Sequence, residues 1–202
     1  MNNPINLIEK ISQFGDLIFD LDNTLLDAED YDRGAFFDIS MAFPAGTDLT
    51  NYLLNRKQEK GPLYPHLFND AVAYYSLPIT AIRQMVELYH QHDAHLVNLS
   101  PEYRNMLECL SAHGHRLFLV TNGNPKTQEK KIEKMAARYL FTDIVICDGI
   151  KQPLKPAPDA YLMLDKKHKL QNPIMIGDMS KIDGLFAEQS GIPFLLHCFR
   201  ED

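Results

Sequence analysis

The feature that most constrains the fold is a series of short apolar runs separated by longer segments. The runs lie at 17–19, 116–120, 144–147, 174–176 and 194–196. Apolar runs of this length, bounded by turn residues, are typical of buried strands. The segments at 6–14, 100–113, 125–139, 158–168 and 181–189 are predicted to be helices. This alternation predicts an α/β fold, with a Rossmann-like parallel sheet, helices on both faces and right-handed crossovers.

A long segment without strands interrupts the series after the first run. It contains predicted helices at 31–42, 48–60, 64–75 and 80–96. With 202 residues, the chain is long enough for one full domain and a small insertion. We therefore expect an α/β core domain formed by 1–27 and 100–202. Residues 28–99 would form an α-helical domain inserted after the first strand.

Polar and charged side chains follow the predicted strands, and most of them are acidic. In chain order they are Asp20, Asp22, Thr121, Asn122, Lys155, Asp178 and Asp183. Parallel sheets bind ligands beyond the carboxyl ends of their strands, so we expect these groups to converge on one rim. Each strand end alone is compatible with ordinary turn chemistry. The four strand ends together, in this order, favour a functional site.

Asp20 and Asp22 are expected to point to the same side of an extended chain. Two carboxylates so close repel each other unless a cation or a proton lies between them. Oxygen ligands favour a divalent cation, and Mg²⁺ in particular. The alternative is an acidic loop that only follows a strand. The residues at the strand ends together supply what cleavage of a phosphate monoester needs. These needs are a carboxylate nucleophile, compensating positive charge and a second acid for the leaving group.

The motifs resemble those of the haloacid dehalogenase superfamily, and the resemblance extends over the whole chain. They are Asp20-Leu21-Asp22-Asn23-Thr24, Thr121-Asn122, Lys155, and Gly177 with Asp178 and Asp183. The helical insertion between the first and second motifs corresponds to the type 1 cap of subfamily I. The resemblance implies that this cap moves and excludes water from the reaction.

The resemblance also implies a role for each motif residue, with Mg²⁺ as the cofactor. Asp20 would be the nucleophile and a Mg²⁺ ligand. Asp22 would be the general acid/base and would bind the metal through its backbone carbonyl. Thr121, Asn122 and Lys155 would bind the phosphoryl group, with Lys155 also paired to Asp20. Asp178 would bind the metal, and Asp183 would bind it or orient its water.

The presence of an acid at position 22 distinguishes between the possible functions. Haloacid dehalogenases proper lack an acid at this position, because a leaving halide needs no proton, so Asp22 favours the phosphatase branch. The remaining alternatives are a dehalogenase-type hydrolase, a phosphomutase and a binding protein without catalytic activity. A phospho-receiver domain combines similar groups, but its acidic pair precedes the acceptor and its Lys comes last.

Composition limits the partners. The net charge of −7, from 20 Lys and Arg against 27 Asp and Glu, argues against nucleic acid. No apolar run is long enough to cross a membrane, and the first four residues do not resemble a signal peptide. Three Cys residues are expected to be reduced, which favours the cytoplasm. We expect a monomer or homodimer that acts on a small phosphorylated metabolite. Sugar phosphates, phosphoglycolate and nucleoside monophosphates all stay open.

Three further groups have weaker signals. His90, His92 and His95 could bind a metal, but a solvated face of the last inserted helix is the preferred interpretation. The lysines of the helix at 125–139 are expected to form a salt-bridged solvent face with interleaved Glu residues. Those lysines are Lys126, Lys130, Lys131 and Lys134. Tyr31 and Arg33 could line a substrate pocket or pack in a core, and the sequence favours neither.

Overall fold

The chain divides into two compact units. The computed structural model describes residues 4–44, 46–61 and 64–199, and residues 1–3 lie outside the described part. The α/β unit comprises Met1–Ala28 and Val97–Asp202, and the helical unit comprises Glu29–Leu96. The predicted division into domains after residues 27 and 99 stays a prediction.

A parallel sheet forms the centre of the α/β unit. Its strands in the described residues are β1 (Asp16–Phe19), β2 (Arg116–Asn122), β3 (Phe141–Cys147), β4 (Pro173–Gly177) and β5 (Phe194–Leu196). Their order is β3-β2-β1-β4-β5, and each neighbouring pair is parallel. The predicted α/β fold is therefore confirmed. The first strand of the chain is the central one, so its carboxyl end has neighbours on both sides.

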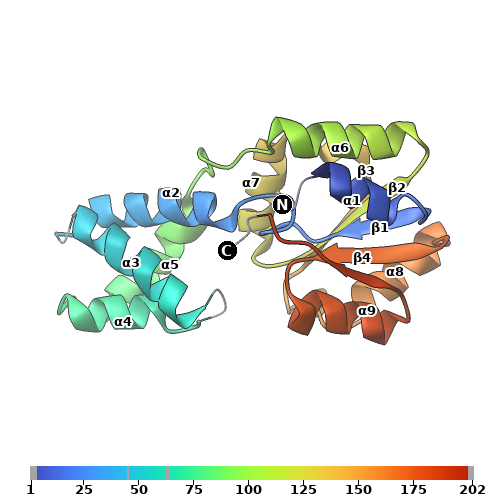
Figure 1. Cartoon of the computed structure of the whole chain (residues 1–202). Helices are drawn as coiled ribbons and strands as arrows, with labels where there is room; N and C mark the ends of the chain where they lie inside the picture. The colour runs from blue at the N-terminus through green and yellow to red at the C-terminus, as the bar shows by residue number, and fades with distance from the viewer. Residues whose placement is uncertain (1–3, 45, 62–63, 200–202) are drawn as a thin grey trace. The chain divides into compact units, whose positions relative to one another are not determined.

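Helices cover both faces of this sheet (Figure 1). They are α1 (Pro4–Ile11), α6 (Pro101–Ala112), α7 (Pro125–Met135), α8 (Asp159–His168) and α9 (Leu185–Ser190), with the 3-10 turn η1 (Arg138–Leu140) and the π-helical turn η2 (Ser180–Gly184). Figure 1 shows α1 and α6 on one face and α8 and α9 on the other. None of the helices in the described ranges has both the length and the apolar character that a membrane crossing needs.

Local side chains set where these helices begin and end. Ser100 caps α6, because its hydroxyl accepts a hydrogen bond from the Tyr103 amide. Asn124 caps α7 in the same way, by accepting from the Lys126 amide. The predicted helix at 125–139 was too long: it ends at Met135, where Ala136 takes a left-handed conformation with φ 49°.

The core of the sheet follows from the alternation of side chains along its strands. Ile18 of β1 lies between Phe118 of β2 and Met175 of β4, and all three are fully buried. They share one apolar cluster with side chains of α8 and α9, including Leu164 and Phe186. Burial of both faces explains why these strands read as continuous apolar runs.

In its described residues the helical unit contains α2 (Ala28–Met41, which begins one residue before the unit), α3 (Thr47–Lys60), α4 (Leu67–Tyr74) and α5 (Ala81–Gln91). Their apolar core includes Phe36, Leu53 and Met85. Tyr31 is fully buried and donates a hydrogen bond from its hydroxyl to the Tyr89 carbonyl at 2.7 Å. Its contacts therefore match the core-packing interpretation of this residue.

An ion pair with a buried carboxylate connects the amino ends of two strands. Asp16, at the start of β1, accepts hydrogen bonds from Nε and Nη2 of Arg116 at 2.6 and 2.5 Å. It also accepts one from the Gln171 amide. Asp16 is 1% exposed, whereas the Arg116 side chain is 36% exposed and also donates to the His168 and Lys169 carbonyls, so loss of the carboxylate removes a two-bond pair but leaves Arg116 partly solvated.

We expect Asp16→Ala to lower the free energy of unfolding by about 2 kcal/mol, measured by urea denaturation, because charge-assisted hydrogen bonds to Arg116 are lost. Glu29→Ala is the matched control, because Glu29 pairs with Arg33 on an exposed helix face. Exposed pairs of this kind contribute about 0.5 kcal/mol or less. Equal losses in the two variants would contradict a special role for the pair with the buried carboxylate.

Candidate active site

Asp20 is the first residue after the central strand. Its amide donates to the carbonyl of Ile176 at 2.9 Å, which continues the pairing of β1 with β4 by one residue. The chain then turns sharply, because the amides of Leu25 and Leu26 both donate to the carbonyl of Leu21. This turn keeps the Asp20 side chain at the carboxyl edge of the sheet, where it is 7% exposed.

Lys155 binds the Asp20 carboxylate from the loop after β3. Its ammonium donates to Oδ1 of Asp20 at 2.7 Å, to Oδ1 of Asp183 at 2.6 Å and to the Val120 carbonyl at 2.8 Å. These contacts use all three of its N–H groups. Burial alone would lower the pKa of Lys155, but the two carboxylates outweigh that effect and raise it. Lys155 is therefore a buried, charged ammonium.

Asn122 holds the backbone of Lys155 in place. Its side-chain nitrogen donates to the Lys155 carbonyl at 2.9 Å, and its side-chain oxygen accepts from the Lys155 amide at 2.8 Å. Thr121 and Asn122 were predicted to lie in a turn, but they are the last two residues of β2 and pair with Ile146 and Cys147. The contacts of Asn122 assign it a supporting position behind Lys155, and its predicted contact with substrate stays a prediction.

Three carboxylates converge at this edge of the sheet. Oxygen atoms of Asp20, Asp178 and Asp183 all lie within 4.8 Å of one another. Burial raises the pKa of Asp20 to about 7, with Lys155 opposing the shift and Asp183 adding to it. Burial and the charge of Asp183 raise the pKa of Asp178 to about 6. The cluster therefore holds more negative charge than Lys155 can balance.

This donor set fits a hard divalent cation. All three side chains offer oxygen, and uncompensated carboxylates are what Mg²⁺ binds in proteins. A bound cation would also reverse the rise in the two pKa values, because a nearby positive charge favours the ionised carboxylate. The sequence-based expectation that Asp20, Asp178 and Asp183 could hold a metal is thus compatible with their geometry.

Gly177 makes room for Asp183. A Cβ atom at Gly177, the last residue of β4, would lie 2.4 Å from Cγ of Asp183. Asp183 is 1% exposed and accepts a hydrogen bond from the Met179 amide at 3.1 Å. Asp183 belongs to the π-helical turn η2, in which the amides of Asp183 and Gly184 both donate to the Met179 carbonyl, and its carboxylate lies against the strand end at Gly177.

The carboxylate of Asp22 has different partners from those expected. Sequence reasoning placed it beside Asp20 around one cation, whereas it accepts hydrogen bonds from Lys131 Nζ at 2.7 and 2.9 Å and from Gln128 Nε2 at 3.0 Å. Lys131 was predicted to lie on a solvent face, and this was wrong: it is 6% exposed. Lys131 and Gln128 are the polar contacts of this site that sequence reasoning missed.

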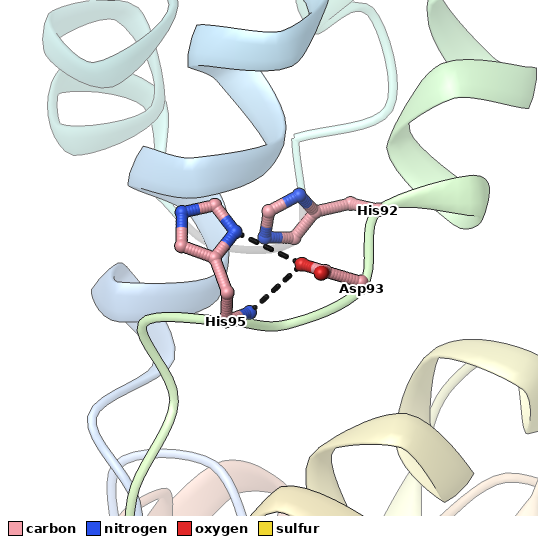
Figure 2. A group of neighbouring side chains, drawn as sticks. All are labelled: His92, Asp93 and His95. Atoms are coloured by element: carbon pink, nitrogen blue, oxygen red, sulfur yellow. Dashed lines mark hydrogen bonds and ion pairs between the residues drawn. The ribbon is translucent and has the colours of Figure 1, made fainter.

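A second group of potential metal ligands lies in the helical unit. Figure 2 shows His92, Asp93 and His95 with their side chains turned toward one another. The sequence placed the histidines on a solvated helix face, but α5 ends at Gln91 and His92 is buried. Its Nδ1 lies 2.6 Å from Oδ2 of Asp38 in α2. His95 Nδ1 lies 2.9 Å from Oδ1 of Asp93.

These contacts give the group a structural interpretation. The Asp93 carboxylate also accepts the His95 amide at 3.1 Å, which closes a local turn after α5. Its side chain is 71% exposed, in contrast to the enclosed carboxylates at the end of β1 and β4. We interpret the three residues as a connection that fastens the segment after α5 to α2.

Comparison with known proteins identifies relatives of the whole sequence. The profile of the haloacid dehalogenase-like hydrolase family matches residues 17–197. A glyceraldehyde 3-phosphate phosphatase of Pyrococcus abyssi is 29% identical over 188 residues, covering 87% of this chain and 78% of the relative. One from Methanothermobacter thermautotrophicus is 26% identical, covering 89% and 84%.

Solved structures with the same fold agree with the family match. A putative haloacid dehalogenase hydrolase of Bacillus subtilis, YfnB, solved bound to magnesium, has a TM-score of 0.70 at 17% identity, covering 91% of this chain and 86% of that one. A putative beta-phosphoglucomutase of Thermotoga maritima has a TM-score of 0.70 at 18% identity, covering 93% and 88%. At these identities the likeness concerns the fold alone.

We expect Gly177→Ala to displace the Asp183 carboxylate and to weaken Mg²⁺ binding by about tenfold or more, measured by calorimetry. The new methyl group cannot share space with a carboxylate that lies 2.4 Å away. Gly191→Ala is the control: a Cβ there meets nothing within 4 Å, so this variant carries the backbone strain of a φ of 69° but displaces no carboxylate. Unchanged affinity in Gly177→Ala would contradict the requirement for Asp183 in this position.

Proposed function

We propose that this chain, which belongs to the haloacid dehalogenase-like hydrolase family, is a phosphatase that hydrolyses small phosphorylated metabolites through Asp20. The observation that carries the proposal is the position of Asp20, fixed at the end of the central strand by a buried ammonium at 2.7 Å. A carboxylate can approach a phosphate dianion only where positive charge compensates, and Lys155 supplies it.

The first step would transfer the phosphoryl group to Asp20. A carboxylate oxygen of Asp20 attacks phosphorus in line, and the bond from phosphorus to the alkoxy oxygen breaks. Asp22 gives its proton to that oxygen, so the product leaves as a neutral alcohol. Thr121, 1% exposed at the end of β2, would donate its hydroxyl proton to a phosphoryl oxygen.

The second step would release inorganic phosphate. Asp22, now ionised, takes a proton from a water molecule whose oxygen attacks phosphorus. The bond between phosphorus and the Asp20 oxygen breaks, and Asp20 returns as a carboxylate. Lys155 stays protonated throughout and compensates the charge that Asp20 carries before and after each transfer.

Mg²⁺ is the cofactor that the carboxylate cluster would hold. Asp20, Asp178 and Asp183, whose oxygen atoms lie within 4.8 Å of one another, would bind it through their side chains, and the backbone carbonyl of Asp22 would be a further ligand. When bound, the ion would neutralise phosphoryl and carboxylate charge that Lys155 alone leaves unbalanced. The gathering of three carboxylates beside a single ammonium supports this part of the proposal.

Two observations favour a phosphatase over a dehalogenase. A leaving halide needs no proton, whereas a leaving alkoxide does, and Asp22 is an acid that could supply it. The relatives from Pyrococcus abyssi and Methanothermobacter thermautotrophicus are both phosphatases by name. Their name also makes glyceraldehyde 3-phosphate the first substrate to test, ahead of other sugar phosphates, phosphoglycolate and nucleoside monophosphates. A cytoplasmic location and a monomeric or homodimeric state stay predictions.

We expect the protein to release phosphate from at least one member of that panel in Mg²⁺ but not in EDTA. Asp20→Asn should reduce turnover to about a hundredth or less, since an amide is not a nucleophile for phosphorus. Asp159→Asn, an exposed substitution on α8, is the control and should keep full activity. Substantial turnover by Asp20→Asn, with its thermal stability near wild type, would remove Asp20 as the nucleophile.

We expect Asp178→Ala to weaken Mg²⁺ binding by about tenfold or more, because the cluster loses a charged oxygen ligand. Calorimetric titration of Mg²⁺ measures this without reference to activity. Asp93→Ala removes a carboxylate from the other potential ligand group and should leave Mg²⁺ affinity unchanged. An equal effect of the two substitutions, or none from Asp178→Ala, argues against the assigned metal site.

A further inference from the structure

Lys131 is the most deeply buried of the four lysines of α7. Lys126 and Lys134 of the same helix are exposed, whereas Lys131 is 6% exposed. Its ammonium lies 2.7 Å from Oδ1 and 2.9 Å from Oδ2 of Asp22. Removing an ammonium from water is costly, and a buried ion pair is weak evidence for a role in stability. Its two contacts instead fix both oxygens of one carboxylate.

Gln128, one helical turn earlier, contacts the same carboxylate and a second residue of the site. Its Nε2 donates to Oδ2 of Asp22 at 3.0 Å and to Oγ1 of Thr121 at 2.8 Å. These two bonds use both hydrogens of the amide nitrogen. Because Oγ1 of Thr121 accepts from Gln128, the hydroxyl proton of Thr121 is directed to a different acceptor. A phosphoryl oxygen is that acceptor in the proposed reaction.

The local backbone is shaped to admit Gln128. Gly123 has φ 150°, and a Cβ atom there would lie 3.0 Å from Cγ and 3.1 Å from Cδ of Gln128. A larger residue would press on the Gln128 side chain. The turn between β2 and α7 thus leaves space for the side chain that connects Thr121 to Asp22.

We infer that Lys131 and Gln128 are positioning residues, which hold the Asp22 carboxylate in the orientation needed for proton transfer to and from the reacting oxygen. This inference rests on the proposed function, in which Asp22 protonates the leaving alkoxide and then accepts a proton from water. Neither Lys131 nor Gln128 gains or loses a proton in that cycle. Gln128 also fixes the Thr121 hydroxyl relative to Asp22, which aligns the phosphoryl group with its proton donor.

The test compares two phosphate esters that differ in their need for an acid. An alkyl phosphate, the best substrate of the panel, must have its leaving oxygen protonated, whereas p-nitrophenyl phosphate releases a stable phenolate. The quantity measured is kcat/KM, which includes the first phosphoryl transfer. Lys131→Met should lower it by about 10- to 100-fold for the alkyl ester and by less than about threefold for the aryl ester.

Matched variants separate positioning from a general structural effect. Lys134→Met removes an exposed lysine from the same helix and should change neither value. Lys131→Arg keeps a charged donor and should recover part of the loss for the alkyl ester. Asp22→Asn should show the same selective loss as Lys131→Met. An equal loss for both esters in Lys131→Met would overturn the inference, and so would no loss for either.

A second measurement does not depend on activity. In a crystal structure of Lys131→Met, the Asp22 carboxylate should have rotated away from its wild-type orientation. An unchanged orientation would overturn the inference even if the wild-type protein released no phosphate. If Lys131→Met fails to fold, Gln128→Glu takes its place in both measurements, because a carboxylate there repels Asp22 instead of donating to it. Failure of the proposed function itself is recognised separately, by turnover that survives in Asp20→Asn or is absent in wild type.

Discussion

The buried ammonium of Lys155 is the interaction on which the site depends. It joins the end of β1 through Asp20, the end of β2 through the Val120 carbonyl and the turn after β4 through Asp183. In a low-dielectric environment a charge held by three acceptors is strongly favoured, whereas the same charge left alone is very costly. The three neighbouring strands therefore hold their carboxyl ends in register around one side chain, and Asn122 fixes the backbone that carries it.

The carboxylates around Lys155 carry more negative charge than its single ammonium balances. This excess connects the structure of the site to its proposed function. Burial raises the pKa of Asp20 to about 7 and that of Asp178 to about 6, so Lys155 alone does not offset the cost of ionising both carboxylates. Oxygen atoms of Asp20, Asp178 and Asp183 lie within 4.8 Å of one another, so their negative charges repel when ionised. A site that stores repulsion in this way gains the most when a divalent cation or a phosphoryl group with its counterion arrives.

The sequence predicted the fold and the acidic rim because both follow from short-range patterns. Apolar runs identify strands buried on both faces, and parallel strands bring their carboxyl ends together, so Asp20, Lys155 and Asp178 could be placed near one another without coordinates. The contacts of Lys131 and the burial of His92 could not be predicted so simply, because charge usually indicates exposure. A signal did exist for Lys131: Gln128, Lys131, Ile132 and Met135 share one helical face, and all four are buried.

Asp20 and Asp22 are separated by one residue, yet the fold gives them different electrostatic partners. Asp20 faces Lys155 and two further carboxylates, whereas Asp22 faces Lys131 and Gln128 from a different helix. Two chemically identical groups can take different roles when their surroundings differ in this way. A nucleophile needs a fixed ionised oxygen beside a cation, and a proton carrier needs a defined orientation toward the reacting oxygen. The short turn after β1 permits both, because Asp20 contacts Lys155 while Asp22 contacts Lys131 and Gln128.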